Sequence, residues 1–263
     1  MKIMTNQYRS STRRTQRNAW RVYEPGCTAY ADALALQHRL VQTRKSSTME
    51  SDLLILLEHP PVFTLGRRGG RENLRVSNDF LEKSDIPIIQ AERGGNITYH
   101  GPGQLVAYII VDLEASRISV KDLVEQLEET MIRTAHWWGI KASRNPTNRG
   151  IWVGNRKMGS IGIAIRKGVT YHGLALNVDM SLEPFRWINP CGLQNVDVTS
   201  LQQESPRHSI TMQSVQPIFK RQFETVFNID LEPVGPDEMG IETVTPAGGR
   251  SLRNDSGRCH SGI

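Results

Sequence analysis

Short runs of apolar residues alternate with segments of helical periodicity along most of this 263-residue chain. The clearest helical pattern covers 120–138, where apolar residues recur every three to four positions after Ser119, a residue type that favours helix N-termini. We expect two further helices over 28–43 and 214–227, the second with three phenylalanines on one stripe. Each of these segments has the pattern of a helix that packs one face on a core.

Strand patterns occupy the segments between these helices. Continuous apolar runs bounded by turn residues indicate buried strands at 52–58 and 105–113. Shorter runs predict further strands over 86–92, 151–153, 156–165 and 169–178. The last three are separated by short turn sequences, so we expect them to form a meander. Helices interspersed with strands predict an α/β domain.

The two ends of the chain lack these patterns. We expect 1–18 to be a disordered basic arm, 19–232 to be one catalytic domain and 233–263 to be a disordered tail. The formal net charge is +5, but residues 1–22 carry six basic residues and no acidic one, so the rest of the chain has a net charge of −1. A nearly neutral domain argues against binding nucleic acid through a basic patch.

Cysteine usage and hydropathy bear on the compartment. The three cysteines, Cys27, Cys191 and Cys259, are widely spaced and form no CxxC pair, which favours a reducing compartment. No apolar run is long enough to span a bilayer, so we expect a cytoplasmic protein without membrane contact. The acid-free, Arg-, Ser- and Thr-rich start is also typical of a transit peptide, which leaves a mitochondrial location as the alternative.

A glycine-rich loop between two expected strands is the strongest candidate for a binding site. It reads RGGNITYHGPGQ over 93–104, and glycine lets the backbone approach a ligand closely. Lys157 stands near the start of an expected strand, and Cys191 stands in an otherwise irregular segment. We interpret these three features as parts of one site.

Several kinds of chemistry remain open from the residues alone. Cys191 is a weak signal for a nucleophile, because buried structural cysteines are common. A neighbouring base or cation would activate its thiol, and the candidates are His59, His100, His172 and Lys157. A metal site of His100, His172 and Cys191 is less favoured because no ligand motif is present, and we expect no metal. The loop is not a dinucleotide fingerprint, since strand-like sequence follows it.

Six motifs, in this order, resemble the lipoyl(octanoyl) transferase family. They are HPPVFTLG at 59–66, RGGNITYHGPGQLVAY at 93–108, GIWV at 150–153, Lys157 with SIG at 160–162, TYHGLALNV at 170–178, and PCG at 190–192 with VTSL at 198–201. The resemblance covers about residues 20–230. Met158 and Gly159 differ from what many relatives carry after the lysine, which leaves the preferred acyl chain length open.

The resemblance implies a reaction and its partners. An octanoyl or lipoyl group would move from acyl carrier protein to a lysine of a lipoyl domain of 2-oxoacid dehydrogenases, or of the glycine-cleavage H protein, as the first step of endogenous protein lipoylation. The transfer would pass through an acyl-cysteine thioester. Because a thioester is already activated, no cofactor is expected. The implied fold is the mixed-sheet α/β fold of biotin and lipoate protein ligase catalytic domains.

The resemblance also assigns residues. Cys191 and Lys157 match the family's catalytic pair, in which the cysteine attacks and the lysine carries the proton. The positions that match its acyl-substrate-binding segments are Arg93, Gly94, Gly95, Asn96, Ile97, Thr98, Tyr99, His100, Ser160, Ile161, Gly162, Gly173, Leu174 and Ala175.

Two alternatives stay open beside this reading. An ATP-dependent lipoate or biotin protein ligase shares the fold and needs no cysteine, whereas a binding module without activity would use Cys191 only for packing. The exposed arginines expected at 67, 68 and 71 are a candidate docking surface for the acidic carrier protein.

Overall fold

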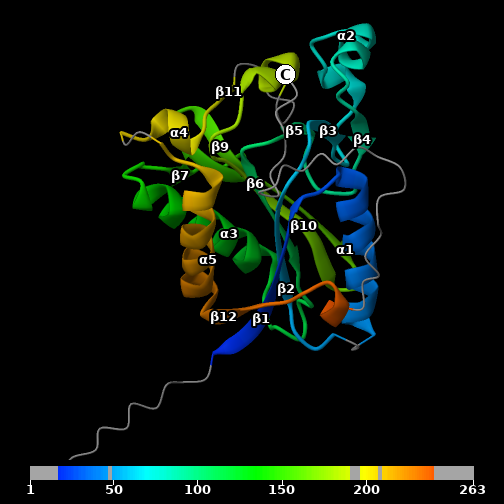
Figure 1. Ribbon diagram of the computed structural model, residues 1–263, viewed down its shortest axis with the longest axis vertical. Helices are drawn as coiled ribbons and strands as arrows, with labels where there is room; N and C mark the ends of the chain where they lie inside the picture. The colour runs from blue at the N-terminus through cyan, green and yellow to red at the C-terminus, as the bar shows by residue number, and fades with distance from the viewer. Residues whose placement is uncertain (1–16, 47–48, 190–195, 207–208, 240–263) are drawn as a thin grey trace, which may run out of the picture.

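A mixed β-sheet forms the centre of the molecule (Figure 1). The structure is a computed structural model that describes residues 17–239 except 47–48, 190–195 and 207–208. In spatial order the sheet contains β12 (Ile229–Pro233), β1 (Asn18–Cys27), β2 (Leu53–Glu58), β6 (Gln104–Ile110), β10 (Val169–Asn177), β9 (Arg156–Arg166), β8 (Gly150–Val153) and β7 (Ser143–Arg144), and β11 (Asp197–Val198) pairs with β9. β1 is parallel to both of its neighbours, β11 is parallel to β9, and the pairs from β2 to β7 are antiparallel.

Helices cover both faces of this sheet, which explains the continuous apolar runs. α1 (Tyr30–Lys45) packs on one face, while α3 (Val120–Trp137) and α5 (Met212–Phe227) pack on the other (Figure 1). Successive side chains of a strand point to opposite faces. In β2, Leu53, Ile55 and Leu57 therefore join the core under α1, whereas Leu54 and Leu56 join the core under α3 and α5.

The ends of the expected helices agree with the structure to different degrees. α3 begins after Ser119, whose side chain accepts a hydrogen bond from Asp122 N. α5 begins two residues before the expected position, because Thr211 and Ser214 form a reciprocal capping box. The expected cap at Thr28 is wrong, since α1 begins at Tyr30 and no side chain caps it.

A smaller sheet lies beside the large one and contains part of the glycine-rich segment. Its order is β4 (Ile88–Gln90), β3 (Val62–Leu65) and β5 (Ile97–His100). It packs on α2 (Asn78–Lys83) and on the 3-10 turn η2 (Glu183–Trp187) through residues that include Phe63, Leu81 and Phe185. The 93–104 segment is thus not one loop, because a strand divides it into two turns.

Several other elements are absent from the expectations. They are β1, β3, β7, β11 and β12, the 3-10 turns η1 (Arg71–Asn73) and η4 (Asp237–Met239), η2, and the helices α2 and α4 (Leu201–Glu204). β1 shows apolar alternation only at Trp20 and Val22, which is too short to stand out. Val234 is buried and η4 follows it, so the folded part continues into the segment expected to be a tail. The expectations for 1–16 and 240–263 lie outside the described residues.

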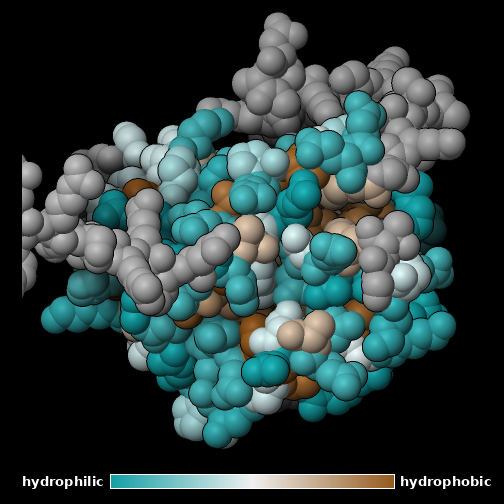
Figure 2. Space-filling model, turned by 90° about the horizontal axis from the view of Figure 1, so that it is seen from below, coloured by the Kyte–Doolittle hydropathy of each residue, from teal (hydrophilic) through white to brown (hydrophobic). Residues whose placement is uncertain are grey.

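Cys27, at the end of β1, is buried and disulfide-bonded. This differs from the expectation of reduced cysteines, because sequence spacing does not reveal which cysteines a fold brings together. Cys191 and Cys259 lie outside the described residues. None of the helices in the described part of the chain is both long and apolar enough to span a bilayer. The face shown in Figure 2 is mostly hydrophilic, with apolar residues in small groups.

Candidate active site

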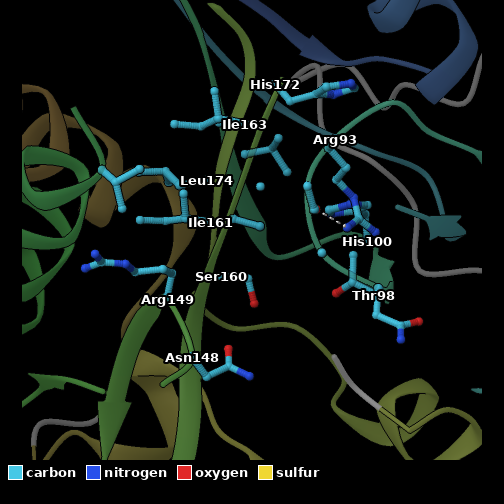
Figure 3. A pocket seen from close by; sticks show the side chains of 18 of the residues that line it. Arg93, Thr98, His100, Asn148, Arg149, Ser160, Ile161, Ile163, His172 and Leu174 are labelled. Atoms are coloured by element: carbon cyan, nitrogen blue, oxygen red, sulfur yellow. Dashed lines mark hydrogen bonds between the residues drawn. The ribbon is translucent and has the colours of Figure 1, made fainter. Parts of the chain in front are cut away.

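A cavity of about 620 Å³ lies against β9 and β10, next to the turn that precedes β5. Its volume is in the range of small-molecule sites. Figure 3 shows Arg93, His100 and His172 toward one end, with Asn148 and Arg149 toward the other. The apolar side chains of Ile161, Ile163 and Leu174 lie between these two groups (Figure 3). The arrangement suits a ligand with an apolar body.

The structure places most of the sequence-predicted residues around this cavity. The lining includes Lys157 and also Arg93, Gly94, Gly95, Asn96, Ile97, Thr98, His100, Ser160, Ile161, Gly162, Gly173, Leu174 and Ala175. Tyr99 is an exception, because it follows Thr98 on β5 and points to the opposite face, where it packs on Phe63 and Phe185 at ring-centroid distances of 5.3 and 5.7 Å. Cys191 lies outside the described residues.

Glycines bring two backbone segments together beside the cavity. Gly94 N donates a hydrogen bond of 3.1 Å to Ile163 O on β9. A Cβ on Gly162 would lie 2.9 Å from Gly94 O, so a larger residue would push these segments apart. On β10, a Cβ on Gly173 would collide with the carbonyl oxygen of Ala107. These glycines are therefore needed for close backbone contact rather than for unusual dihedral angles.

Lys157 is held in a defined place on β9. It is 4% exposed, and its Nζ donates a hydrogen bond to Asn148 Oδ1. Nζ also lies 5.2 Å from the centroid of the Trp152 ring. The carbonyl oxygen of Lys157 accepts a bond of 2.9 Å from Thr199 N, and Val198 of β11 pairs with Lys157. Residues that follow Cys191 in the chain are thus paired directly with the lysine-bearing strand.

Buried polar side chains connect the two ends of the site. Arg93 Nη2 donates to Thr64 Oγ1 at 2.7 Å, and this hydroxyl is 3.3 Å from His100 Nε2. His100 Nδ1 is 2.7 Å from Gln104 Oε1. Gln104 Nε2 in turn donates to Asn177 Oδ1 at 2.9 Å. All five residues are at most 9% exposed, so the bonds are shielded from water.

The same series of bonds continues to the segment beside Lys157. Asn177 Nδ2 donates to Thr199 O at 2.9 Å, and Thr199 N donates to Lys157 O. Gln104 and Asn177 can each accept one hydrogen bond and donate the next, because Asn and Gln side chains carry both a carbonyl oxygen and an NH₂ group. Gln104, Asn177 and Thr199 belong to three of the sequence motifs, and their shared role is to join the motifs into one rigid unit.

The three candidate histidines are held neutral. Burial lowers the pKa of His59 to about 4 and that of His172 to about 3, and burial with nearby His59 and Arg93 holds the pKa of His100 well below its usual range. Both ring nitrogens of His59 are bonded, Nδ1 to Thr28 O at 2.6 Å and Nε2 to Tyr108 Oη at 2.7 Å. Both ring nitrogens of His100 are also bonded, to Thr64 and Gln104, whereas those of His172 have no hydrogen-bond partner among the described residues. Burial keeps all three rings neutral, which favours Lys157 over these histidines as the partner of a reactive thiol.

Other residues of the site carried little or no sequence signal. Examples are Tyr30, Val120, Val124, Asn148, Arg149 and Ile163, which all line the cavity. Asn148 and Arg149 directly precede the GIWV motif, which is the one local sign of their position. Among the described residues, no three His, Cys, Asp or Glu side chains form a group that could hold a metal ion.

Solved structures with the same fold include lipoate protein ligases. The ligase from Thermoplasma acidophilum, reported with its E2 lipoyl domain, superposes with a TM-score of 0.66 at 16% identity, over 85% of this chain and 90% of that one. Lipoate-protein ligase A bound with ATP gives a TM-score of 0.63 at 16% identity, over 86% and 92% of the two chains. At this identity the likeness shows the fold alone, and it confirms the expected mixed-sheet α/β architecture.

Sequence relatives are much closer. A family model described as the lipoyl protein ligase A/B catalytic domain matches residues 29–224. An octanoyltransferase of Desulfotalea psychrophila is 50% identical over 182 residues, which cover 68% of this chain and 82% of the relative. An octanoyltransferase of Nitratidesulfovibrio vulgaris is 46% identical over 202 residues, covering 77% and 92%. At this identity and coverage, the chain belongs to the octanoyltransferase family.

Proposed function

We propose that this octanoyltransferase transfers an octanoyl group from acyl carrier protein to a lysine of a lipoyl domain, and that the group is held on Cys191 between the two half-reactions. The observation that carries the proposal is Lys157, a buried lysine that lines the same cavity as the apolar side chains of Ile161, Ile163 and Leu174. β11 pairs with this lysine-bearing strand, and it follows Cys191 by six residues in the chain.

In the first half-reaction, Cys191 Sγ attacks the thioester carbonyl of the octanoyl carrier protein. The side-chain amine of Lys157 takes the thiol proton and returns it to the phosphopantetheine sulfur as the carbon–sulfur bond breaks. The products are an octanoyl-Cys191 thioester and the free carrier thiol.

In the second half-reaction, the neutral amine of the acceptor lysine attacks the same carbonyl carbon. An amide bond forms, the thioester bond to Sγ breaks, and Lys157 carries the amine proton to the departing thiolate. Cys191 and Lys157 regain their starting states, so no ATP or other cofactor is consumed.

The cavity accounts for the apolar part of the substrate. Ile161, Ile163 and Leu174 offer an apolar surface along β9 and β10, on which an alkyl chain would lose contact with water. Gly162 lets the 93–95 turn lie close against β9 at the edge of this space. We infer that the octanoyl chain lies along β9 and β10, beside the 93–95 turn.

Intact-mass measurement after incubation with octanoyl-acyl carrier protein tests the proposal. Wild type should gain one hydroxylamine-sensitive octanoyl group, while Cys191→Ala should gain none. Lys157→Met should acylate at least about 100-fold more slowly, since a positioned acid–base group contributes about 10²- to 10⁴-fold. An ATP-dependent ligase would instead stay active with Cys191→Ala and would use free octanoate, and a binding module would form no adduct at all.

The exposed arginines of the 66–71 turn are our candidate docking surface for the acidic carrier protein. Arg67, Arg68 and Arg71 are exposed, and Arg68 also lines the cavity. Opposite charges accelerate encounter, mainly at low salt. A charge reversal of Arg67 and Arg68 should therefore slow acylation at low salt, whereas the same change at exposed Arg39 of α1 should not. Equal acylation rates for both variants would show that Arg67 and Arg68 are not part of the docking surface.

The named relatives are octanoyltransferases of bacteria, which supports the cytoplasmic expectation over the mitochondrial one. Detection of the chain in the cytosolic fraction of its own cells would test this location.

A further inference from the structure

Asn148 and Trp152 hold the end of the Lys157 side chain from two directions. Lys157 Nζ donates to Asn148 Oδ1 and lies 5.2 Å from the centroid of the Trp152 ring. The two neighbours are also bonded to each other, since Trp152 Nε1 donates to Asn148 O at 3.1 Å. The three residues therefore contact one another in a closed set. Asn148 takes part through both its backbone carbonyl and its side-chain amide, so its orientation is fixed.

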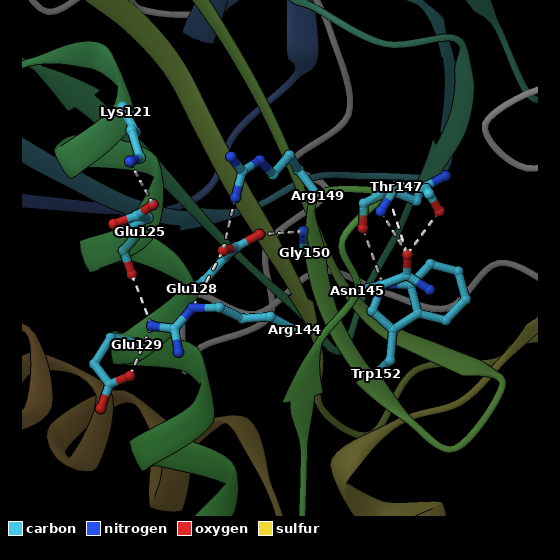
Figure 4. A network of polar contacts seen from close by, with 11 residues as sticks. Lys121, Glu125, Glu128, Glu129, Arg144, Asn145, Thr147, Arg149, Gly150 and Trp152 are labelled. Carbon is cyan, nitrogen blue, oxygen red and sulfur yellow. Dashed lines mark hydrogen bonds and ion pairs between the residues drawn. The ribbon is translucent and has the colours of Figure 1, made fainter.

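The turn that carries Asn148 is fixed by its own residues. Asn145 Oδ1 accepts bonds from Thr147 N at 3.0 Å and from Asn148 N at 3.1 Å (Figure 4). Gly150, at the end of the turn, has a φ of 120°. A Cβ at Gly150 would collide with the carbonyl oxygen of Gly159, so the turn lies directly against β9.

The carboxylate of Glu128, on helix α3, holds this turn in place. Glu128 Oε1 accepts a bond of 3.0 Å from Gly150 N, and Oε2 lies 3.4 Å from both Arg149 Nη1 and Arg144 Nε (Figure 4). The Glu128 side chain is 0% exposed. A buried charge is costly unless it is paired and hydrogen-bonded, and these three donors satisfy it.

The neighbouring carboxylate provides an internal comparison. Glu129 also pairs with Arg144, through a bond of 2.7 Å from Nη2, and with Arg133 at 2.8 Å. Both of these partners, Arg133 and Arg144, lie outside the 145–150 turn, and the Glu129 side chain is 30% exposed. Of these two adjacent acids on α3, Glu128 is the one that reaches the backbone of the turn.

We propose that Asn148 is a positioning residue that aims the Lys157 amine at the reacting sulfur, and that Glu128 holds the turn that carries Asn148. The inference rests on the proposed role of Lys157. An amide oxygen can accept from the lysine in both of its protonation states without adding charge, so Asn148 directs Nζ while leaving its proton free to move. An aspartate at this position would instead hold the proton on Nζ.

Acylation and thiol alkylation together test the role of Asn148. With octanoyl-acyl carrier protein, Asn148→Ala should lower the maximal acylation rate roughly 10- to 100-fold, because misplacement of a reacting group costs about this much, while the carrier concentration at half-maximal rate stays unchanged. Asn148→Asp should be at least as slow. Iodoacetamide labelling of the Cys191 peptide, followed by mass spectrometry against pH, should require a higher pH in both variants than in wild type.

Paired substitutions on α3 test the anchor. Glu128→Met should reproduce the slow acylation of Asn148→Ala, and Glu128→Gln, which keeps an acceptor for Gly150 N, should restore most of the rate. Glu129→Met should acylate like wild type. Circular dichroism of each variant reports whether it folds, and Asn148→Ala, at a half-buried position, keeps the test decisive if Glu128→Met does not fold.

The outcomes separate this inference from the proposed function. If wild type forms no adduct on Cys191, the proposed function itself fails. If wild type forms the adduct and Asn148→Ala matches its acylation rate and its alkylation profile, Lys157 needs no such support and the inference is overturned. A variant that changes only the half-saturating carrier concentration would assign Asn148 to substrate binding and would also overturn it.

Discussion

Replacing Gly162 with alanine should narrow the cavity at the point where β9 meets the 93–95 turn. The added Cβ would lie 2.9 Å from Gly94 O, whereas ordinary contacts begin at 3.4 Å, so Gly94 must retreat by about 0.5 Å. Arg93 Cδ, at 3.2 Å, restricts the same space. The bond of 3.1 Å from Gly94 N to Ile163 O resists this movement.

The expected loss of stability follows from two opposing effects. Overpacking in a well-packed region costs about 1–3 kcal/mol. Alanine has less conformational freedom than glycine in the unfolded chain, which stabilises the folded state by about 0.4–1 kcal/mol. The net loss is then about 0.5–2 kcal/mol, which for a domain of this size lowers the melting temperature by roughly 1–8 °C. Gly94→Ala is the matched control, because its nearest neighbour would be at 3.4 Å and its φ is not positive.

Thermal unfolding and acyl-chain preference are the two assays. Acylation by hexanoyl-, octanoyl- and decanoyl-carrier protein, measured by intact mass, should shift toward the shorter chain in Gly162→Ala and stay unchanged in Gly94→Ala. The reasoning is refuted if both variants have the melting temperature of wild type and its preference among the three acyl chains. The 93–95 turn would then not form a wall of the acyl site.

Two further predictions concern buried polar groups. The pKa values of His59 and His172 are lowered to about 4 and about 3, below the usual 6.5, so the unfolded chain takes up protons first as the pH falls. The free energy of unfolding should therefore decrease below about pH 6.5 by about 1.4 kcal/mol per pH unit for each ring until its folded pKa is reached. Urea unfolding at pH 7 and pH 5 measures this decrease. If the free energy of unfolding of His59→Gln depended on pH as steeply as that of wild type, the prediction would be contradicted. Asn177→Leu should cost about 2–6 kcal/mol, because Gln104 Nε2 and Thr199 O each lose a buried partner worth about 1–3 kcal/mol. Asn177→Asp keeps the acceptor for Gln104 Nε2, so its free energy of unfolding in urea should lie between those of Asn177→Leu and wild type. If Asn177→Leu is as stable as wild type, these two hydrogen bonds do not contribute to stability.

The helices and the central strands were predictable because their signals are local. α3 has a full apolar period and a serine cap, and β2 is apolar throughout because both of its faces are covered. Most residues that the motifs name line one cavity, and glycines of these motifs allow close backbone contact there, as at Gly162 and Gly173. Tyr99 was assigned wrongly because a motif names consecutive residues, whereas a strand turns every second one away.

By itself, the sequence determined most local elements and the family, and it named candidate residues for the chemistry, since periodicity, caps and motifs are all properties of short segments. Only the tertiary structure decided that β1 pairs with β12 from the other end of the domain, and that Asn148 and Glu128 support Lys157. Such contacts join segments far apart in the chain, and their geometry depends on how the whole sheet and its helices pack. A polar residue in a turn has no local pattern that tells which buried amine it will meet.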